Sequence, residues 1–420
     1  MRMKFYYGWY IVIGSALCQF VCMATSQVTV GVLMTPVIEE LGWKVWQFTF
    51  GLSVSLLGGA ISSVIVGKII DSRGPKILVL LGALTSTLCF VALGTQSNIF
   101  AFITLYSIGG LIGWSLFGPM VVNVTLSKWF IEKRGWTISL GSMGSSSAFV
   151  ITPFLFTLIV DSWGWRNGYF LLAFLVAVIV IPTSLLMRRQ PEDYGLIPDG
   201  KNKECQTKKY HETVPEINLT REQALRTYPF WAITIGFALI TGGLMGIFVH
   251  GLPFAEESGF SRKIGATALS INGIGNLCAK PVWGYFLQRI NTLKIVLAAY
   301  SLTSIAVMLI LLSGQENNGV LLLIAFLLFG IGFSATVPLN EFITAEYFGR
   351  AHLGAIRGAS YPLTTIGTLI GPILTGYWFD VAETYVPAFL SIIVVFIVAM
   401  GITYSARKPE KIISTVSYTH

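Results

Sequence analysis

Residues 46–96 decide the architecture of this chain, and they read WQFTFGLSVSLLGGAISSVIVGKIIDSRGPKILVLLGALTSTLCFVALGTQ. Two apolar runs, 46–69 and 77–96, stand on either side of a short polar segment. Each run reaches or exceeds the roughly 20 helical residues that cross about 30 Å of hydrocarbon. Two such runs joined by a short polar turn predict neighbouring helices of a multi-pass membrane protein.

Similar runs continue along the whole chain. Of its 420 residues, 54% are hydrophobic and only 11% are charged, whereas soluble proteins have about 25% charged residues. We therefore predict an all-α membrane protein with twelve transmembrane helices. The expected spans lie near residues 9–33, 46–69, 77–96, 99–126, 136–160, 168–187, 229–253, 264–287, 293–313, 319–343, 354–378 and 386–405. The first run is too long for a signal-peptide core, so we expect it to be retained as a helix.

The basic residues predict the orientation in the membrane. Most of the 28 Lys and Arg residues fall in loops on one side of the predicted spans, and only Lys44, Arg166, Arg262 and Lys263 fall on the other. Because Lys and Arg gather in short cytoplasmic loops, both termini are expected in the cytoplasm and the chain in the inner (plasma) membrane. The net charge of +8 then follows from topology, and it is no reason to expect nucleic-acid binding.

One longer polar segment, residues 188–228, interrupts the spans and is rich in Lys, Glu and Pro. We interpret it as a cytoplasmic linker between an N-terminal six-helix half, 1–187, and a C-terminal six-helix half, 229–420. A short surface helix is expected near Thr220–Arg226. A small ligand-binding domain of about 40 residues is the alternative, although so short a chain buries little core.

The two halves repeat each other in sequence. The stretch 128–135, KWFIEKRG, is echoed by EYFGRAHLG at 346–354. Single residues also recur at constant spacing: Pro153, Asp161 and Phe170 as Pro372, Asp380 and Phe389, and Gly67 and Asp71 as Gly284 and Gln288. Many secondary transporters consist of two parallel repeats with the substrate site at the midplane between them. The repeat therefore predicts two pseudo-symmetric halves.

These motifs resemble a known family. The segment GKIIDSRGPK at 67–76 is similar to the loop signature of the major facilitator superfamily. Within that superfamily, four features resemble bacterial monocarboxylate transporters and the related oxalate:formate exchanger: Gly74-Pro75-Lys76, Tyr7-Gly8-Trp9-Tyr10, Phe348-Gly349 and the Gly371-Pro372, Gly376, Asp380 pattern. The resemblance covers essentially the whole chain. It implies a monomeric secondary transporter that works by alternating access.

The 67–76 loop is a candidate gate. We expect Asp71 to cap the start of the third span or its own turn, Gly74 and Pro75 to force a tight reversal, and Arg73 to stay at the cytoplasmic face. A loop that only sets topology is the alternative, although such a loop needs no Asp.

Lys280 is the basic residue that we cannot assign to a loop or to the end of a segment, because it lies inside the apolar run 264–287. An ionisable side chain there indicates a functional site, and Pro281 after it is expected to bend the helix. Monocarboxylate and oxalate carriers have an Arg-Pro at the matching place, where the cation binds the substrate carboxylate, so the resemblance implies that role for Lys280. Snorkelling to the membrane interface is the alternative.

Other polar side chains are expected near the substrate. Asn276 precedes Lys280 by one helical turn and so shares its face. Asn123 and Gln27 are candidates because spans one and four line the cavity in this superfamily, and Tyr361 lies in span eleven. Each of these residues has an alternative role in holding helices together.

His250 in span seven is the candidate for proton entry from outside, because histidine titrates near physiological pH. A hydrogen-bonded structural histidine is the alternative. Lys280 is a second candidate for proton coupling, since a buried lysine changes its protonation readily. Among the acidic residues, Glu341 lies nearest the centre of a predicted span, and we expect it to cap a helix or to belong to a gate.

The resulting prediction is a proton-coupled symporter of a small monocarboxylate, lactate- or pyruvate-like, and not an enzyme. One buried cation suits one carboxylate, because the region 358–365 has none of the second cation that the oxalate exchanger uses in span eleven. An organic-anion exchanger or a carrier of larger aromatic or hydrophobic acids is the alternative; a drug exporter and a non-transporting sensor are more distant ones. We expect no cofactor and no metal, since the five cysteines include no CxxC pair.

Overall fold

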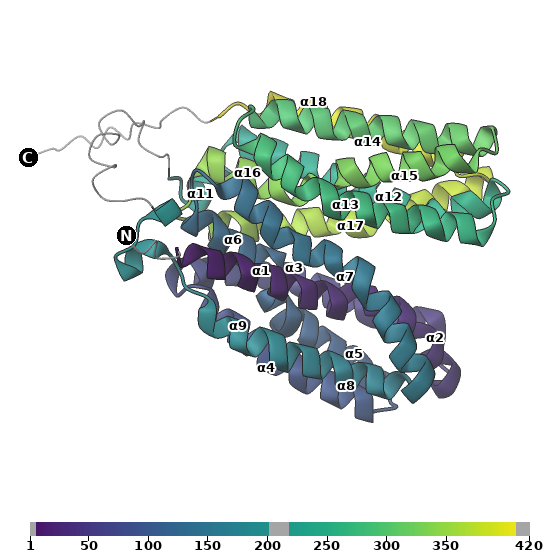
Figure 1. Cartoon of the computed structure of the whole chain (residues 1–420), viewed down its shortest axis with the longest axis horizontal. Helices are drawn as coiled ribbons and strands as arrows, with labels where there is room; N and C mark the ends of the chain where they lie inside the picture. The colour runs from purple at the N-terminus through teal and green to yellow at the C-terminus, as the bar shows by residue number, and fades with distance from the viewer. Residues whose placement is uncertain (1–5, 201–217, 409–420) are drawn as a thin grey trace, which may run out of the picture.

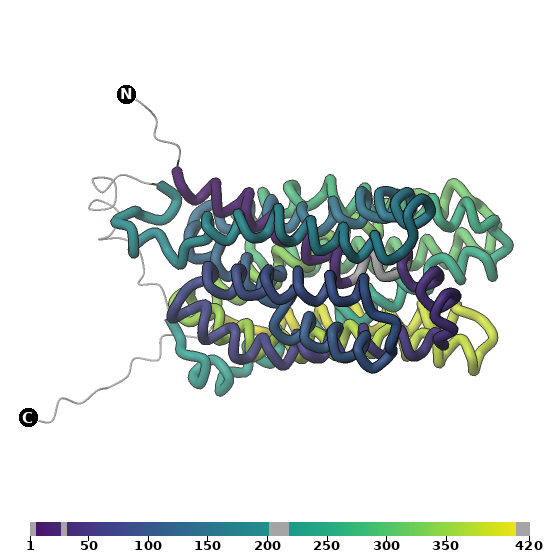
Figure 2. Tube along the Cα trace, turned by 90° about the horizontal axis from the view of Figure 1, so that it is seen from below, coloured from purple at the N-terminus to yellow at the C-terminus, as the bar shows by residue number. Residues whose placement is uncertain are grey.

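The computed structural model describes residues 6–200 and 218–408 of the chain, with the side chains of residues 27–31 excepted. Within these ranges all regular secondary structure is helical. The helices run lengthwise through the molecule and form two bundles (Figures 1 and 2).

Six helical segments cross the first half, and three of them are interrupted. They are α1 (Gly8–Met23), continued by η1 (Ala24–Val28) and α2 (Thr29–Leu41); α3 (Val45–Ser72); α4 (Pro75–Thr95); α5 (Ile99–Ile108), continued by η2 (Gly109–Gly113), η3 (Trp114–Phe117) and α6 (Pro119–Trp129); α7 (Arg134–Trp163); and α8 (Trp165–Leu175), continued by η4 (Val176–Val180) and α9 (Ile181–Leu186).

Six more segments cross the second half. They are α12 (Tyr228–Glu257), α13 (Arg262–Leu287), α14 (Thr292–Gln315), α15 (Gly319–Ser334) with α16 (Thr336–Phe348), α17 (Leu353–Ala382) and α18 (Val386–Ser405). The prediction of twelve spans is therefore confirmed. The surface helix expected near Thr220–Arg226 is α11 (Arg221–Leu225), and the Thr220 side chain accepts a hydrogen bond from the Gln223 backbone N–H at its start.

The first and fourth predicted spans are among those that differ from single straight helices. The first extends beyond residue 33 to Leu41, through the π-helical turn η1. The fourth changes to π and 3-10 geometry between Gly109 and Phe117. Glycine weakens a helix and permits close approach of another backbone, and a side chain at Gly110 would lie 2.1 Å from the Ser55 carbonyl oxygen of α3. Close packing on α3 therefore accompanies the break.

Ten of the twelve segments are long and apolar enough to cross a membrane by composition alone, whereas α13 and α17 are not among them. These two helices pack against the opposite half: α13 on α7, and α17 on α3. A helix that faces protein over much of its surface does not need a fully apolar sequence. Their lower hydropathy thus matches their place at the contact between the halves.

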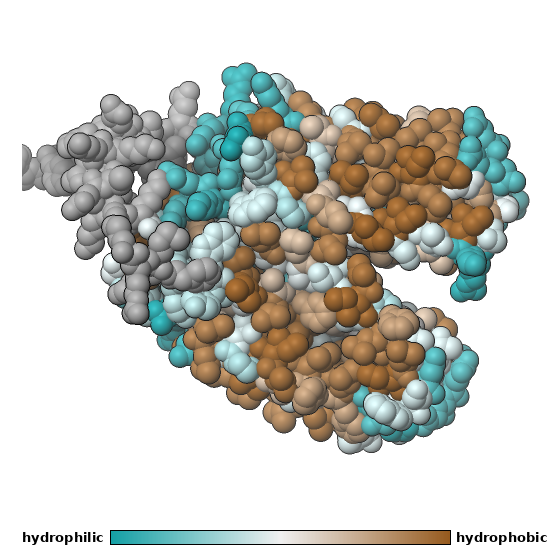
Figure 3. Space-filling view, in the orientation of Figure 1, coloured by the Kyte–Doolittle hydropathy of each residue, from teal (hydrophilic) through white to brown (hydrophobic). Residues whose placement is uncertain are grey.

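The buried side chains form two separate apolar cores. One contains residues between Ile11 and Met187, joined by Ala345 and Leu353, and the other contains residues between Leu219 and Ala406. Large apolar side chains are also exposed around the bundles, as at Ile61 and Leu88. Figure 3 shows them as a brown belt with hydrophilic residues at both ends. This belt is the surface that lipid covers.

The two ends of the molecule differ. We call the end that carries the described linker residues, 188–200 and 218–227, the linker face. There the halves are in contact, and a side chain at Gly67 of α3 would lie 2.2 Å from the Gly354 carbonyl oxygen of α17. At the opposite end Figure 3 shows a wide notch between the bundles, which we call the open face. The structure thus has one closed and one open end.

Candidate functional site

Lys280 lies where the two halves touch. It is on α13 with only 3% of its surface exposed, and its Nζ donates to the Ser142 carbonyl oxygen at 2.6 Å and to Ser145 Oγ at 3.1 Å. Both serines belong to α7 of the other half. In the described parts of the chain, no carboxylate forms an ion pair with Lys280. A buried ammonium group therefore depends on two neutral oxygens, which leaves it able to accept an anion.

Asn276 continues this contact one turn earlier along α13. Its Oδ1 accepts a hydrogen bond of 2.7 Å from Ser146 Oγ of α7. Asn276 and Lys280 thus both face the serines of α7. The glycines of the same segment of α7 face elsewhere, since a side chain at Gly144 would meet the Ala16 carbonyl oxygen of α1 at 1.9 Å.

The remaining predicted substrate residues lie apart from Lys280. Asn123 is fully buried in the first half, where its Oδ1 accepts a 3.0 Å hydrogen bond from Gln19 Nε2. Gln27 belongs to the π-helical turn η1, and its side chain lies outside the described residues. Tyr361 is on α17 and lines a pocket.

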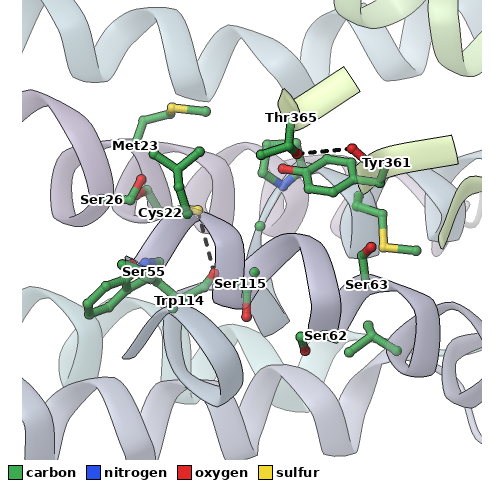
Figure 4. A pocket seen from close by; sticks show the side chains of 17 residues that line it. Cys22, Met23, Ser26, Ser55, Ser62, Ser63, Trp114, Ser115, Tyr361 and Thr365 are labelled. Carbon is green, nitrogen blue, oxygen red and sulfur yellow. Dashed lines mark hydrogen bonds between the residues drawn. The ribbon is translucent and has the colours of Figure 1, made fainter. Parts of the chain in front are cut away.

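This pocket lies between the first half and α17, and sequence analysis missed most of it. Figure 4 shows Tyr361 and Thr365 of α17 on one side, with serines of the first half around them. Its lining residues are Cys22, Met23, Ser26, Ser55, Leu56, Gly59, Ser62, Ser63, Val66, Gly110, Trp114, Ser115, Gly118, Pro119, Met120, Tyr361 and Thr365. None of them is charged. The sequence feature that could have indicated the pocket is the pair Ser55 and Ser62, which are seven residues apart and therefore on one face of a helix.

His250 lies on α12 toward the open face. Its Nδ1 is 3.1 Å from Tyr385 Oη, and its Nε2 is 3.0 Å from the Pro372 carbonyl oxygen. A carbonyl can only accept, so Nε2 carries a proton, and Nδ1 shares its hydrogen bond with the Tyr385 hydroxyl. Both ring nitrogens are engaged, and the site is separate from Lys280.

Asp71 has a different partner from the one expected. It does not cap the third span or its own turn. Its carboxylate accepts from the backbone N–H groups of Gly354 at 3.1 Å and Ala355 at 2.7 Å, at the start of α17 in the other half. Its Oδ1 also lies 2.6 Å from Lys128 Nζ of α6. The positive end of the α17 dipole and a buried ammonium both favour a carboxylate there. Sequence spacing could not reveal these partners, because 283 residues separate Asp71 from Gly354.

The other two predicted gate residues shape the turn. Arg73 directly follows α3 and is exposed. Gly74 has a φ of +80°, a conformation that favours glycine, and it packs against Arg189 of the linker, whose Cβ would lie 2.7 Å from an added Cβ. Gly74 thus allows the chain to turn into α4 directly beneath the linker.

Arg357 corrects the expectation that Lys280 is the single basic residue away from loops and segment ends. It lies one turn inside α17 with 5% of its surface exposed. Its guanidinium forms a bidentate pair with Glu341 of α16, with N–O distances of 3.0 and 2.9 Å. Glu341 therefore caps no helix. The sequence could have indicated this buried charge, because Arg357 falls within the predicted span 354–378.

Both described ends of the linker bind loops of the linker face. Asp199 accepts from the backbone N–H groups of Ile131, Glu132 and Lys133 at 2.9–3.1 Å. The Oδ1 of Asn218 accepts in the same way from Arg350 and Ala351, both at 3.1 Å. These two loops are the ones that the sequence repeat relates to each other.

Arg350 then connects the two halves. Its Nη1 donates to the Lys128 carbonyl oxygen at 3.1 Å, and its Nη2 lies 2.7 Å from Glu192 Oε1 of the linker. Lys128 is also the partner of Asp71. Charged and capping contacts from both halves and from the linker therefore close the linker face together.

Comparison with known proteins shows the family. The family model described as Major Facilitator Superfamily matches residues 15–363 and, again, 266–416. The chain is 21% identical over 359 residues to the uncharacterized MFS-type transporter YcxA of Bacillus subtilis (strain 168), covering 84% of this chain and 83% of that protein. It is 24% identical over 323 residues to Multidrug resistance protein MdtG of Enterobacter lignolyticus (strain SCF1), covering 77% and 73%. It is 23% identical over 395 residues to Monocarboxylate transporter 13 of Rattus norvegicus, covering 91% and 85%.

Solved structures share the fold. The proton:xylose symporter XylE bound to 6-bromo-6-deoxy-D-glucose superimposes with a TM-score of 0.78 at 13% identity, covering 96% of both chains. FucP in the outward conformation gives a TM-score of 0.69 at 14% identity, covering 95% of this chain and all of that one (100%). With the family match over most of its length and this fold, the chain belongs to the Major Facilitator Superfamily of non-enzymatic membrane transporters.

Proposed function

We propose that this protein is a secondary transporter that moves a small monocarboxylate, lactate- or pyruvate-like, together with a proton across the plasma membrane. The observation that carries the proposal is Lys280, a buried cation at the contact between the halves whose partners among the described residues are Ser142 and Ser145. Lys128 and Arg357 are buried as well but pair with Asp71 and Glu341, so we match the charge of Lys280 to a substrate carboxylate. The similarity to rat Monocarboxylate transporter 13 over 91% of the chain supports the same substrate class.

In this proposal the linker face is cytoplasmic, as the distribution of basic residues predicts, and both termini lie there. The open face then admits substrate from outside. The protein acts as a monomer, and it needs no cofactor and no metal.

The substrate competes with α7 for Lys280. A carboxylate makes a stronger, charge-assisted hydrogen bond to an ammonium than a carbonyl or a hydroxyl does. When it takes the place of Ser142 and Ser145, α13 loses one of its polar ties to α7. Asn276, which holds Ser146, is next to the vacated position and orients the substrate. Substrate binding thereby weakens the contact that closes the linker face, which is the first requirement of alternating access.

The other predicted site residues have supporting roles in this proposal. Tyr361 contacts the uncharged part of the substrate from α17. Gln27 stays a candidate of the first span, and Asn123 holds α6 against α1 through Gln19. Asp71, Arg73 and Gly74 form the gate at the linker face.

His250 admits the proton from the open face. Its Nε2 donates to the Pro372 carbonyl oxygen, so an incoming proton binds at Nδ1, where the Tyr385 hydroxyl then accepts it. Lys280 and the substrate carboxylate together form a neutral unit, and the proton makes the net movement of the monoanion electrically neutral.

A drug exporter is the second candidate, because MdtG is a relative of comparable similarity. The charge of Lys280 opposes it for cationic compounds. An organic-anion exchanger keeps the role of Lys280 and differs only in lacking proton coupling.

Uptake of radiolabelled lactate into proteoliposomes, with and without an inward proton gradient, tests the proposal. Wild type is compared with Lys280→Ala, and Lys263→Ala is the matched control, because Lys263 is exposed on the same helix. We expect gradient-driven uptake in wild type and control and at least a tenfold loss in Lys280→Ala. Uptake that survives Lys280→Ala contradicts the site, and uptake that ignores the gradient indicates exchange.

Proton coupling is tested separately through His250. We expect His250→Ala to abolish the stimulation by the gradient while lactate-for-lactate exchange persists. Tyr385→Phe removes only the hydrogen bond to Nδ1, so it should retain coupling. Full gradient stimulation in His250→Ala would assign the histidine to structure alone.

A further inference from the structure

Two helix crossings join the halves at the linker face, and the sequence repeat relates them to each other. The repeat matches Gly67 of α3 with Gly284 of α13, and these helices cross α17 and α7 of the opposite half. A side chain at Gly67 would lie 2.2 Å from the Gly354 carbonyl oxygen, and one at Gly284 would lie 2.9 Å from the Gly135 carbonyl oxygen. The crossings are therefore equivalent in place, and that of α3 with α17 is the closer one.

A charged contact reinforces the crossing of α3 with α17. Asp71 accepts from the Gly354 and Ala355 backbone N–H groups of α17 and pairs with Lys128. Its counterpart in the repeat is Gln288, which directly follows α13. Gln288 is neutral and exposed, and within residues 6–200 and 218–408 its side chain forms no hydrogen bond. The crossing of α13 with α7 thus has no equivalent of the Asp71 contact.

One helical turn deeper, each crossing has a second polar tie, and the two ties differ in charge. The repeat spacing matches Ser63 of α3 with Lys280 of α13. Ser63 Oγ lies 3.2 Å from the Gly358 carbonyl oxygen of α17, whereas Lys280 Nζ donates to Ser142 and Ser145 of α7. A carboxylate competes well for an ammonium and poorly for a neutral hydroxyl. Of these two ties, an anionic ligand can therefore take over that of Lys280.

We infer that the linker face opens in two steps, in which the crossing of α13 with α7 separates first and the crossing of α3 with α17 stays joined by Asp71 as a pivot. A ligand shifts a conformational equilibrium only through its different affinity for the two states. A carboxylate that takes Lys280 acts on the first crossing alone. The inference rests on the proposed function of Lys280 and adds the order in which the contacts separate.

Two pairs of spin labels compare the crossings in the full-length protein, after replacement of the five native cysteines. Ile131 and Ile290 flank the crossing of α7 with α13, and Ser72 and His352 flank that of α3 with α17; all four are exposed. With saturating lactate, we expect the fraction of molecules with a lengthened distance to be at least threefold larger for Ile131–Ile290 than for Ser72–His352.

Matched variants rank the two crossings without any ligand. Lys280→Ala removes the tie to α7, so the lengthened fraction of the Ile131–Ile290 pair should rise at least threefold in the absence of lactate. Ser63→Ala changes the equivalent position of α3, and the Ser72–His352 distances should stay unchanged because Asp71 still holds α17. Lys280→Met keeps most of the side-chain volume and serves if Lys280→Ala does not fold.

Gln288→Asp supplies the missing carboxylate. The repeat places it near the start of α7, where the helix dipole favours a negative charge. We expect it to lower the lengthened fraction of the Ile131–Ile290 pair about fivefold, the usual size of such an interaction. Gln288→Asn shortens the side chain equally but stays neutral, so it is the control.

Three results overturn the inference: equal lengthened fractions for both label pairs, lengthening of Ser72–His352 alone, or identical distances in Gln288→Asp and Gln288→Asn. Failure of the proposed function is distinguishable. If lactate changes neither pair, lactate is not the ligand, and the ligand-free comparison of Lys280→Ala with Ser63→Ala decides the order. None of these measurements depends on proton-driven uptake.

Discussion

Asp71 Oδ1 and Lys128 Nζ lie 2.6 Å apart, and both side chains are at least nine-tenths buried. The same carboxylate accepts hydrogen bonds from the first backbone N–H groups of α17. One side chain thus joins α3 and α6 of the first half to α17 of the second. Removing it leaves a buried ammonium and two backbone donors without their acceptor, so closure of the linker face depends on this residue.

Asp71→Ala should therefore shift the protein away from the arrangement with an open face. Spin labels at Trp163 and Val320 measure this shift, because both are exposed at the open-face ends of α7 and α15, in different halves. The five native cysteines are replaced first. We expect the population with the shorter distance to grow about tenfold or more, equivalent to roughly 1.4 kcal/mol. Asp71→Glu retains the charge and is the control; an unchanged distance distribution in Asp71→Ala would contradict the gate.

The glycines at the crossing of α3 and α17 should tolerate no side chain. A methyl group at Gly67 would lie 2.2 Å from the Gly354 carbonyl oxygen, so the two backbones must move apart. We expect Gly67→Ala to reduce lactate uptake at least tenfold and to shorten the distance between the labels at the open face. Gly401→Ala is the control, since an added Cβ there meets nothing within 4 Å. Equal uptake by the two variants would show that the crossing is not essential.

Loss of one partner of the Arg357–Glu341 pair should lower the free energy of unfolding more than loss of both. Arg357→Met leaves the Glu341 carboxylate buried and unpaired, and such a change costs about 3–5 kcal/mol of unfolding free energy. The double change Glu341→Leu with Arg357→Met removes both charges, and we expect it to restore most of the loss. Chemical unfolding in detergent measures all the variants as a double-mutant cycle. Additive effects of the two single changes would show that the side chains do not interact.

Glu40 makes the stability depend on pH. It lies at the end of α2, about 48 Å along the chain from the start of α1 and so beyond the hydrocarbon. Hydrogen bonds from Arg166, and then from Trp165, lower the pKa of its carboxyl group in the folded state. A lowered folded-state pKa stabilises at pH values above the unfolded pKa, and the contribution disappears as the pH falls through the folded pKa.

Wild type should therefore be more thermostable than Glu40→Gln at neutral pH, and the difference should diminish below about pH 4, the ordinary range of a carboxyl group. Thermal unfolding in detergent at a series of pH values gives this comparison. Glu39→Gln is the control, because the neighbouring Glu39 is exposed on the same helix. A difference that stays constant down to pH 3 would exclude the carboxylate as its source.

Much of the architecture follows from local sequence. All twelve spans were predictable, because transfer of apolar residues into hydrocarbon depends on the residues of each segment. The least apolar spans, α13 and α17, were still recognisable by length. Their lower hydropathy reflects contacts with α7 and α3, which no single segment reveals.

The candidate site was only partly predictable. Lys280 stood out because a charge within an apolar run is rare, and Asn276 followed from helical spacing. The partners of these residues did not follow: Ser142 is 138 residues from Lys280 along the chain. Arg357 was counted among the basic residues of the cytoplasmic loops. Its pairing with Glu341 could not be predicted, because it exists only when α16 and α17 are packed together.

By itself, the sequence determined the number of helices, the repeat of the two halves and the place of Lys280 within a span, because hydrophobicity and helical periodicity are local properties of consecutive residues. Only the tertiary structure decided which end is closed, that Asp71 caps α17 instead of its own turn, and that Ser55, Ser62 and Tyr361 share a pocket. Hydrogen bonds and ion pairs act over about 3 Å, so they exist only after packing has brought distant parts of the chain together.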